Sequence, residues 1–244
     1  MSDKSAKLLE AFETHSPGKI RELLASGLSP VKPIKDKLPI VWAYEMYLRS
    51  PKFAECFRVM LDAGATLDDP LLEALLLDDA EALTKFPSAP QRKFFLECTF
   101  TPLKGVSALH ICAEYNSVKC AKALIEAGAA VDSRADIDED GIGGHTPLFQ
   151  SVNSHRNYSR PMMELLVEAG ADLNIRLKGL IWGCGFEWET AIFDVTPISY
   201  AQCGLYKQFQ RDDTGVFSNV AYLYKHRYGK ELQLRNVPNK YLAS

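Results

Sequence analysis

Long apolar runs are absent from this sequence. The longest apolar cluster, residues 71–77, is short and is interrupted by a glutamate, whereas a helix that spans a bilayer needs about 20 predominantly apolar residues. Residues 1–12 alternate charged and apolar side chains and so lack the apolar segment of a secretory signal. We expect a cytoplasmic protein that does not enter a membrane.

An excess of either charge is also absent. The 244 residues include 28 Lys and Arg against 31 Asp and Glu, which gives a formal net charge of −3 at pH 7. Nucleic acids and acidic membranes attract proteins that carry a strong positive field. The balance of charge therefore argues against both as general partners.

Motifs that carry chemistry are missing as well. The six cysteines include no pair with the spacing of a zinc knuckle or a redox dithiol, and we interpret most of them as small buried hydrophobic residues. No two histidines have the helical spacing of a metal site, and no G-x-S-x-G motif occurs. Gly183 and Gly185 are followed by Trp188 where a phosphate-binding loop needs a third glycine. The sequence predicts no enzyme, no metal and no cofactor.

What is present is a repeated pattern, which is clearest in residues 107–132. Apolar residues recur at helical spacing from Leu109 to Ala113, and the pattern resumes at Val118. Gly128 follows, where a residue able to adopt positive φ ends the second helix. The pattern predicts two helices of about two turns each, joined by a tight turn, and helices this short are stable only when they pack on neighbours.

This stretch resembles an ankyrin repeat. Residues 107–112 read Ser-Ala-Leu-His-Ile-Cys, similar to the T-P-L-H-x-A signature of the family, and Ala127-Gly128-Ala129 is similar to its helix-ending Gly-Ala. Similar openings recur at Pro39-Ile40, Pro70-Leu71, Thr146-Pro147-Leu148 and Thr196-Pro197-Ile198, and similar endings at Ser26-Gly27, Ala63-Gly64-Ala65 and Ala169-Gly170-Ala171. The first openings are spaced near the family period of about 33 residues, and the later, longer spacing indicates insertions.

The resemblance implies a single domain over residues 1–244: an all-α ankyrin-repeat solenoid of stacked helix-turn-helix units with extended β-hairpin fingers. The predicted units are an N-terminal cap at 4–30, repeats at 38–68, 69–90, 107–132 and 146–174, a C-terminal cap at 196–229 and a tail at 230–244. By the same resemblance, His110 is a structural residue that tethers a loop to its helix. The bridge before the fourth unit contains Phe94-Phe95-Leu96, which we expect to pack down on the repeats.

The connecting finger at residues 133–144 is acidic. Asp136, Asp138 and Asp140, with the glycine that follows them, match the first half of a calcium-loop pattern, in which oxygen ligands alternate. The twelfth position of that pattern is Pro147 rather than a bidentate glutamate, which argues against a calcium hand. We interpret the finger as a solvated acidic loop; contact with a basic partner and a loose cation site are the alternatives.

The connecting finger at residues 175–194 is aromatic. Alternating residues on both sides of Gly183-Cys184-Gly185 predict a β-hairpin. Burying the rings of Trp182, Phe186 and Trp188 would remove roughly 150–250 Å² each from water, too much to leave solvated. The rings therefore pack either on the neighbouring units or on a partner, and Trp is frequent among the hot spots of protein interfaces.

The resemblance implies a non-catalytic, monomeric protein–protein interaction module that binds another protein through its concave face and its fingers. The predicted binding residues are Asp136, Asp138, Asp140, Trp182, Phe186 and Trp188, on two fingers that flank one groove. One alternative is an inhibitor or immunity-type protein that holds an enzyme or toxin inactive. A second alternative is a thiol-dependent enzyme that uses Cys184, with His145 or His155 as its base.

Overall fold

The computed structural model describes residues 3–98, 103–209 and 211–232, so most of the predicted tail at 230–244 lies outside the described residues. Within these ranges the α-helices come in six consecutive pairs. The pairs are α1 (Asp3–Glu13) with α2 (Pro17–Ala25), α3 (Pro39–Glu45) with α4 (Phe53–Asp62), α5 (Pro70–Leu76) with α6 (Ala80–Leu83), α7 (Ala108–Tyr115) with α8 (Val118–Glu126), α9 (Pro147–Ser151) with α10 (Arg160–Glu168), and α11 (Pro197–Gln202) with α12 (Asp213–Tyr228). Short 3-10 turns are η1 (Ala89–Gln91), η2 (His155–Asn157), η3 (Cys203–Leu205) and η4 (Lys207–Phe209).

Proline or a side-chain cap marks where most of these helices begin. Proline occupies the first turn of α2, α3, α5, α9, α10 and α11, where its missing N–H would have no partner inside the helix. Asp69 and Asp79 each accept a hydrogen bond from the backbone N–H three residues on, at 3.1 and 2.9 Å, and so cap α5 and α6. The helices α3, α5, α7, α9 and α11 all begin at the openings that the sequence predicts.

Four of the second helices end in the same way. A glycine with φ between 85° and 94° follows each of α2, α4, α8 and α10, in a region of backbone conformation that favours glycine. These glycines are Gly27, Gly64, Gly128 and Gly170. The next N–H then closes the turn on the carbonyl five residues back, as from Ala129 N to Leu124 O at 2.9 Å. Each connecting finger therefore leaves its helix in the same direction.

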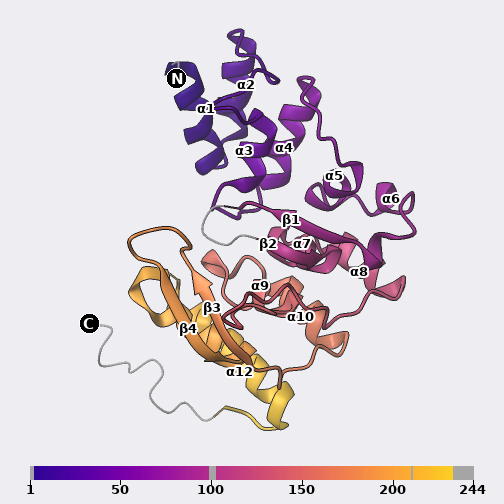
Figure 1. Cartoon of the computed structure of the whole chain (residues 1–244), viewed down its shortest axis with the longest axis vertical. Helices are drawn as coiled ribbons and strands as arrows, with labels where there is room; N and C mark the ends of the chain where they lie inside the picture. The colour runs from indigo at the N-terminus through magenta and orange to yellow at the C-terminus, as the bar shows by residue number, and fades with distance from the viewer. Residues whose placement is uncertain (1–2, 99–102, 210, 233–244) are drawn as a thin grey trace.

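Each helix pair packs on the pair next to it. The first helices α5, α7, α9 and α11 contact one another in that order, and so do the second helices α6, α8, α10 and α12. At the N-terminal end, α1 packs on α3 and α2 packs on α4. One apolar core runs from Leu8 in α1 to Leu223 in α12, as a stack of individually unstable units requires. Figure 1 shows the pairs succeeding one another along the long axis, from indigo to yellow.

Two antiparallel β-hairpins show that the fold is not all-α. β3 (Leu177–Trp182) pairs with β4 (Thr190–Val195), which confirms the predicted hairpin. β1 (Lys93–Leu96) pairs with β2 (Leu103–Ser107), and the sequence interpretation missed this sheet. Phe94 and Leu96 are buried while Phe95 between them is 69% exposed, because successive side chains of a strand point to opposite faces. The prediction that Phe94-Phe95-Leu96 packs on the repeats is therefore right for Phe94 and Leu96 and wrong for Phe95.

Candidate functional site

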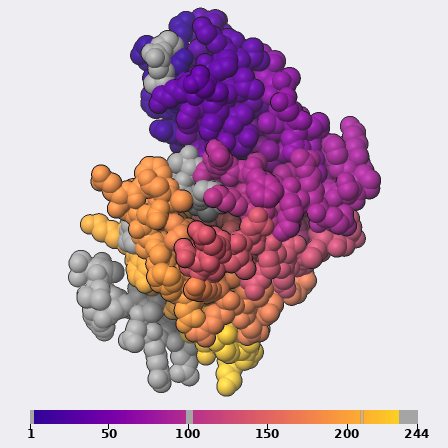
Figure 2. Space-filling model, viewed as in Figure 1, coloured from indigo at the N-terminus to yellow at the C-terminus, as the bar shows by residue number. Residues whose placement is uncertain are grey.

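The fingers that connect the helix pairs are joined edge to edge. We call the β1–β2 hairpin, the acidic finger at residues 133–144 and the β3–β4 hairpin together the finger ridge. Asp136 N donates a hydrogen bond to Lys104 O at 3.1 Å and joins the acidic finger to β2. Gly143 N donates to Gly179 O at 2.9 Å and joins the same finger to β3. The acidic and aromatic fingers are thus in direct contact here, rather than separated by the groove that the sequence suggested, and Figure 2 shows the orange hairpin against the red part of the chain.

Hydrogen bonds hold the acidic finger in shape. One carboxylate oxygen of Asp138 accepts from two backbone N–H groups within the turn, at 2.8 and 3.0 Å. Lys178 of β3 donates to the backbone carbonyl of Asp140. The Asp136 carboxylate lies directly against Gly105, where a Cβ atom would be 1.9 Å from its Oδ1. All three predicted aspartates are exposed, so the ridge presents negative charge on a well-supported turn.

The acidic residues do not gather into a metal site. Within the part of the chain that the structure describes, no group of three or more His, Cys, Asp or Glu side chains is arranged to hold a metal ion. Over the same residues, no helix combines the length and the apolar character needed to cross a membrane. The three exposed aspartates therefore form part of a surface that a partner can contact.

The aromatic finger packs partly on its own repeat. Trp182 is only 7% exposed and stacks on Phe209 of η4, with the ring centroids 4.2 Å apart. Trp188 lies 4.8 Å from Trp182, and Phe186 stacks on Trp188 at 5.1 Å. Phe186 is 42% and Trp188 40% exposed. Trp182 thus anchors the hairpin from inside, while the other two predicted rings present part of their surface to solvent.

Each part of the ridge also exposes one large apolar side chain that the sequence interpretation did not select. Phe95 of β1 is 69%, Ile137 of the acidic finger 61% and Phe193 of β4 65% exposed. A Cβ at Gly179 would lie 2.8 Å from Ile142 Cδ1 and 3.2 Å from Phe193 Cδ1, so Phe193 stands at the joint of two fingers. The alternation of β4 could have identified Phe193, whereas nothing local separates Ile137 from an ordinary loop residue.

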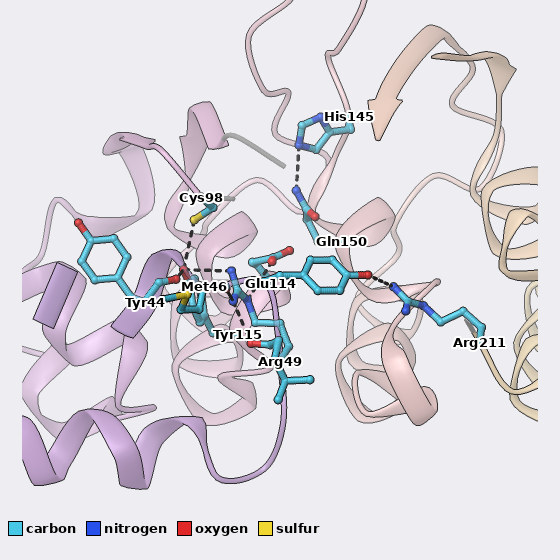
Figure 3. A network of polar contacts seen from close by, with 11 residues as sticks. Tyr44, Met46, Arg49, Cys98, Glu114, Tyr115, His145, Gln150 and Arg211 are labelled. Atoms are coloured by element: carbon cyan, nitrogen blue, oxygen red, sulfur yellow. Dashed lines mark hydrogen bonds and ion pairs between the residues drawn. The ribbon is translucent and has the colours of Figure 1, made fainter. Parts of the chain in front are cut away.

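A polar network joins helices that lie far apart in the sequence (Figure 3). Arg49, which follows α3, donates from Nε to Glu114 Oε1 of α7 at 2.9 Å, and both side chains are mostly buried. The guanidinium also lies over the ring of Tyr115, 4.3 Å from its centroid. Tyr115 Oη donates to Tyr44 O at 2.6 Å and is 3.4 Å from Cys98 Sγ. These polar groups contact one another, so the network supports the fold rather than offering a reactive site.

The thiol that the sequence singles out differs from the other cysteines. Cys184 is exposed at the turn of the β3–β4 hairpin, and the candidate base His155 lies in η2, between α9 and α10. The other candidate base, His145, has its Nε2 3.0 Å from Gln150 Nε2 (Figure 3), and burial, with the charge of Arg134, lowers its pKa to about 4. A base with so low a pKa is a weak acceptor for a thiol proton.

Three further thiols belong to the core. Burial raises the pKa of Cys56 and Cys98 to about 11 and that of Cys120 to about 12. The thiolate is the reactive form of cysteine, and these groups are protonated at neutral pH. They act as small core residues, as predicted.

Stacked short helix pairs that share one long apolar core and carry projecting fingers define a helical repeat scaffold, a class that presents one extended surface. Residues 70–176 match the family model of ankyrin repeats (3 copies). The predicted resemblance is therefore confirmed over α5 to α10, a segment that includes the acidic finger. No curated protein matches the chain. Ankyrin repeats are in general protein–protein interaction modules, and helices α1–α4 and the β3–β4 hairpin lie outside the matched segment.

Proposed function

We propose that the chain is a non-catalytic module that binds another protein through the finger ridge and the adjoining concave face of the stack. The observation that carries this proposal is the ridge itself, in which backbone hydrogen bonds join three fingers that each expose a large apolar residue. Buried aromatic and apolar anchors supply most of the binding energy at protein interfaces. The proposal rests on the residues Phe95, Ile137, Phe186, Trp188 and Phe193.

The charge of the ridge favours a partner with a basic contact surface. Asp136, Asp138 and Asp140 are exposed on the acidic finger, which lies between the two hairpins. Complementary charge at the rim of an interface mainly speeds association and selects the partner, and apolar contacts supply the affinity. Higher ionic strength should therefore slow the association of the partner more than it speeds its release.

Site-specific photo-crosslinking in native cytosol tests the proposal. A photoreactive amino acid at Phe193 or Ile137 should give an adduct of one defined mass, and the same amino acid at Lys122, which is exposed on α8, should not. The Phe95→Ser variant, which alters a different finger, should reduce the adduct formed at Phe193. The proposal fails if positions 193 and 122 give the same products.

The two alternative roles give different results in the same experiment. An inhibitor or immunity-type protein would crosslink to an enzyme or toxin whose activity falls when the chain is added. A thiol enzyme would show a turnover that Cys184→Ser abolishes while the crosslink at Phe193 persists. That second result would contradict a purely binding role.

A further inference from the structure

A basic hollow lies beside α1 and the segment that follows α2. Figure 1 shows these two helices at the other end of the stack from the β3–β4 hairpin. The hollow has a volume of about 520 Å³ and lies between the start of α1 and the finger that follows α2. Its lining includes three lysines, Lys4, Lys32 and Lys35, and three apolar residues, Leu28, Pro33 and Ile34. A volume of this size is within the range of small-molecule sites.

All charges that line the hollow have the same sign. Lys4, Lys32 and Lys35 are positive, and the lining contains no Asp or Glu. Lys4 Nζ donates to Ser26 O at 2.7 Å, and none of the ion pairs between described residues involves Lys32 or Lys35. Four other cations of this part of the chain have acidic partners, namely Lys7 with Asp3, Lys19 with Glu10, Arg21 with Glu55 and Lys37 with Glu45. In a chain with a net charge of −3, the hollow is therefore a local excess of positive charge.

The walls that carry these lysines are held by hydrogen bonds. Ser29 Oγ accepts a hydrogen bond from Lys32 N at 3.2 Å, which holds the turn from Ser29 to Lys32. Ile34 N donates to Lys37 O at 2.8 Å and closes the turn that contains Lys35. Trp42 Nε1 donates to Ile34 O at 2.9 Å and ties this turn to α3. The hollow is thus formed by a supported loop.

We propose that this hollow binds a small compound that carries phosphate groups. Phosphate oxygens accept charge-assisted hydrogen bonds from several ammonium groups at once, and an anion relieves the repulsion among three like charges. The apolar side chains of Leu28, Pro33 and Ile34 line the same space and provide a contact for the organic part of the compound. A site at this end of the stack can be occupied while the finger ridge binds its partner.

Titration of the full-length chain with inorganic pyrophosphate at constant ionic strength tests this inference. Saturable shifts of the amide resonances of residues 27–35 are expected. The Lys32→Gln/Lys35→Gln variant should bind at least about tenfold more weakly, because it removes two of the three ammonium groups that line the hollow. The matched control is Lys7→Gln/Lys19→Gln, which removes two cations of the same helix pair that already have acidic partners, and it should bind like the wild type.

Two results would overturn the inference. One is a response to pyrophosphate no larger than the response to sodium chloride at the same ionic strength. The other is an equal loss of binding in the two double variants, which would reflect net charge rather than this hollow. Thermal unfolding of each variant, followed by circular dichroism, verifies that a loss of binding does not come from a loss of structure.

Discussion

At the scale of single residues, His110 determines how the acidic finger leaves the repeat. Ser107 N donates to its Nδ1 at 3.1 Å, so Nε2 carries the proton and donates to His145 O at 3.0 Å. The ring is fully buried, and burial, with the nearby His145, lowers its pKa to about 3. A neutral imidazole offers one acceptor and one donor, and His110 uses both to join the start of α7 to the end of the acidic finger. These two bonds confirm the structural role that the T-P-L-H resemblance implies.

We expect His110→Ala to lower the free energy of unfolding by about 3 kcal/mol, because it removes the acceptor of the Ser107 N–H, takes one of two donors from His145 O, which keeps the bond from Ala135 N, and opens a cavity. Urea unfolding followed by circular dichroism measures the change. His226→Ala, which alters an exposed histidine of α12, should have little effect. Equal stabilities of the two variants would contradict the tethering role.

Buried histidines should make the fold sensitive to acid. Burial is the main cause that lowers the pKa of His15 and His145 to about 4 and that of His110 to about 3, below the ordinary value of 6.5. The unfolded chain therefore binds more protons between pH 6.5 and 4, and stability is lost as the pH falls through this window. His15 alone accounts for about 3 kcal/mol of this loss.

The variant His15→Asn isolates one histidine. His15 has a φ of 44°, and asparagine tolerates that left-handed region better than most residues. Urea unfolding between pH 7.5 and 4.5 should show a smaller loss of stability for the variant than for the wild type. The raised pKa values of Glu45 and Asp78 act in both proteins and do not disturb the comparison. Identical pH profiles would show that His15 does not titrate as its burial implies.

At the scale of elements, different side chains of the aromatic finger are expected to stabilise the fold and to bind a partner. Trp182 is buried against Phe209, whereas Phe193 on the paired strand is 65% exposed. Trp182→Ala should destabilise the hairpin by about 3–5 kcal/mol, the usual cost of removing a buried Trp, and should speed amide exchange in β3 and β4. Phe193→Ala should leave exchange unchanged and weaken the binding of a partner. Faster exchange in the Phe193 variant would show that this ring stabilises the fold instead.

The sequence predicts these elements unevenly, for physical reasons. Helix starts and ends depend on local chemistry, such as proline in the first turn of α9 or the positive φ of Gly128, and both can be read from a few adjacent residues. The β1–β2 pair was missed because its strands have four and five residues, too short for a clear alternating pattern.

The candidate site was only partly predictable. The three aspartates, Phe186 and Trp188 are exposed, whereas Trp182 is buried, and the predicted role of these residues in binding a partner stays a prediction. The joining of the fingers could not be predicted, because the bonds from Gly143 N to Gly179 O and from Asp136 N to Lys104 O use backbone atoms that every residue type except proline provides. The exposure of Phe95 was missed because β1 was missed, and that of Ile137 because no local pattern distinguishes it from an ordinary loop residue.

At the scale of the whole molecule, the helices α1–α4 form an N-terminal block that Figure 2 shows as an outlying indigo lobe. The Arg49–Glu114 pair connects this block to α7, and Tyr47 Oη accepts from the guanidinium of Arg211, 164 residues further on, at 3.3 Å. Removing one partner of a buried ion pair leaves the other charge without compensation, which costs about 3–5 kcal/mol. Besides the continuous apolar core and the Tyr115–Tyr44 hydrogen bond, the attachment of the block therefore depends on Arg49.

We expect Arg49→Met to loosen the N-terminal block before it unfolds the other repeats. Hydrogen exchange should become faster in α1 to α4 than in α7 to α10, because the Arg49–Glu114 pair couples these two parts of the stack. Replacing both partners, in Arg49→Met/Glu114→Leu, should restore part of the stability, since no unpaired charge remains. Arg21→Met is the matched control, because its pair with Glu55 is exposed and lies within the block, and such pairs contribute about 1 kcal/mol or less. Uniform acceleration of exchange across all repeats in Arg49→Met would instead mean that the stack unfolds as one cooperative unit, with no separate N-terminal block.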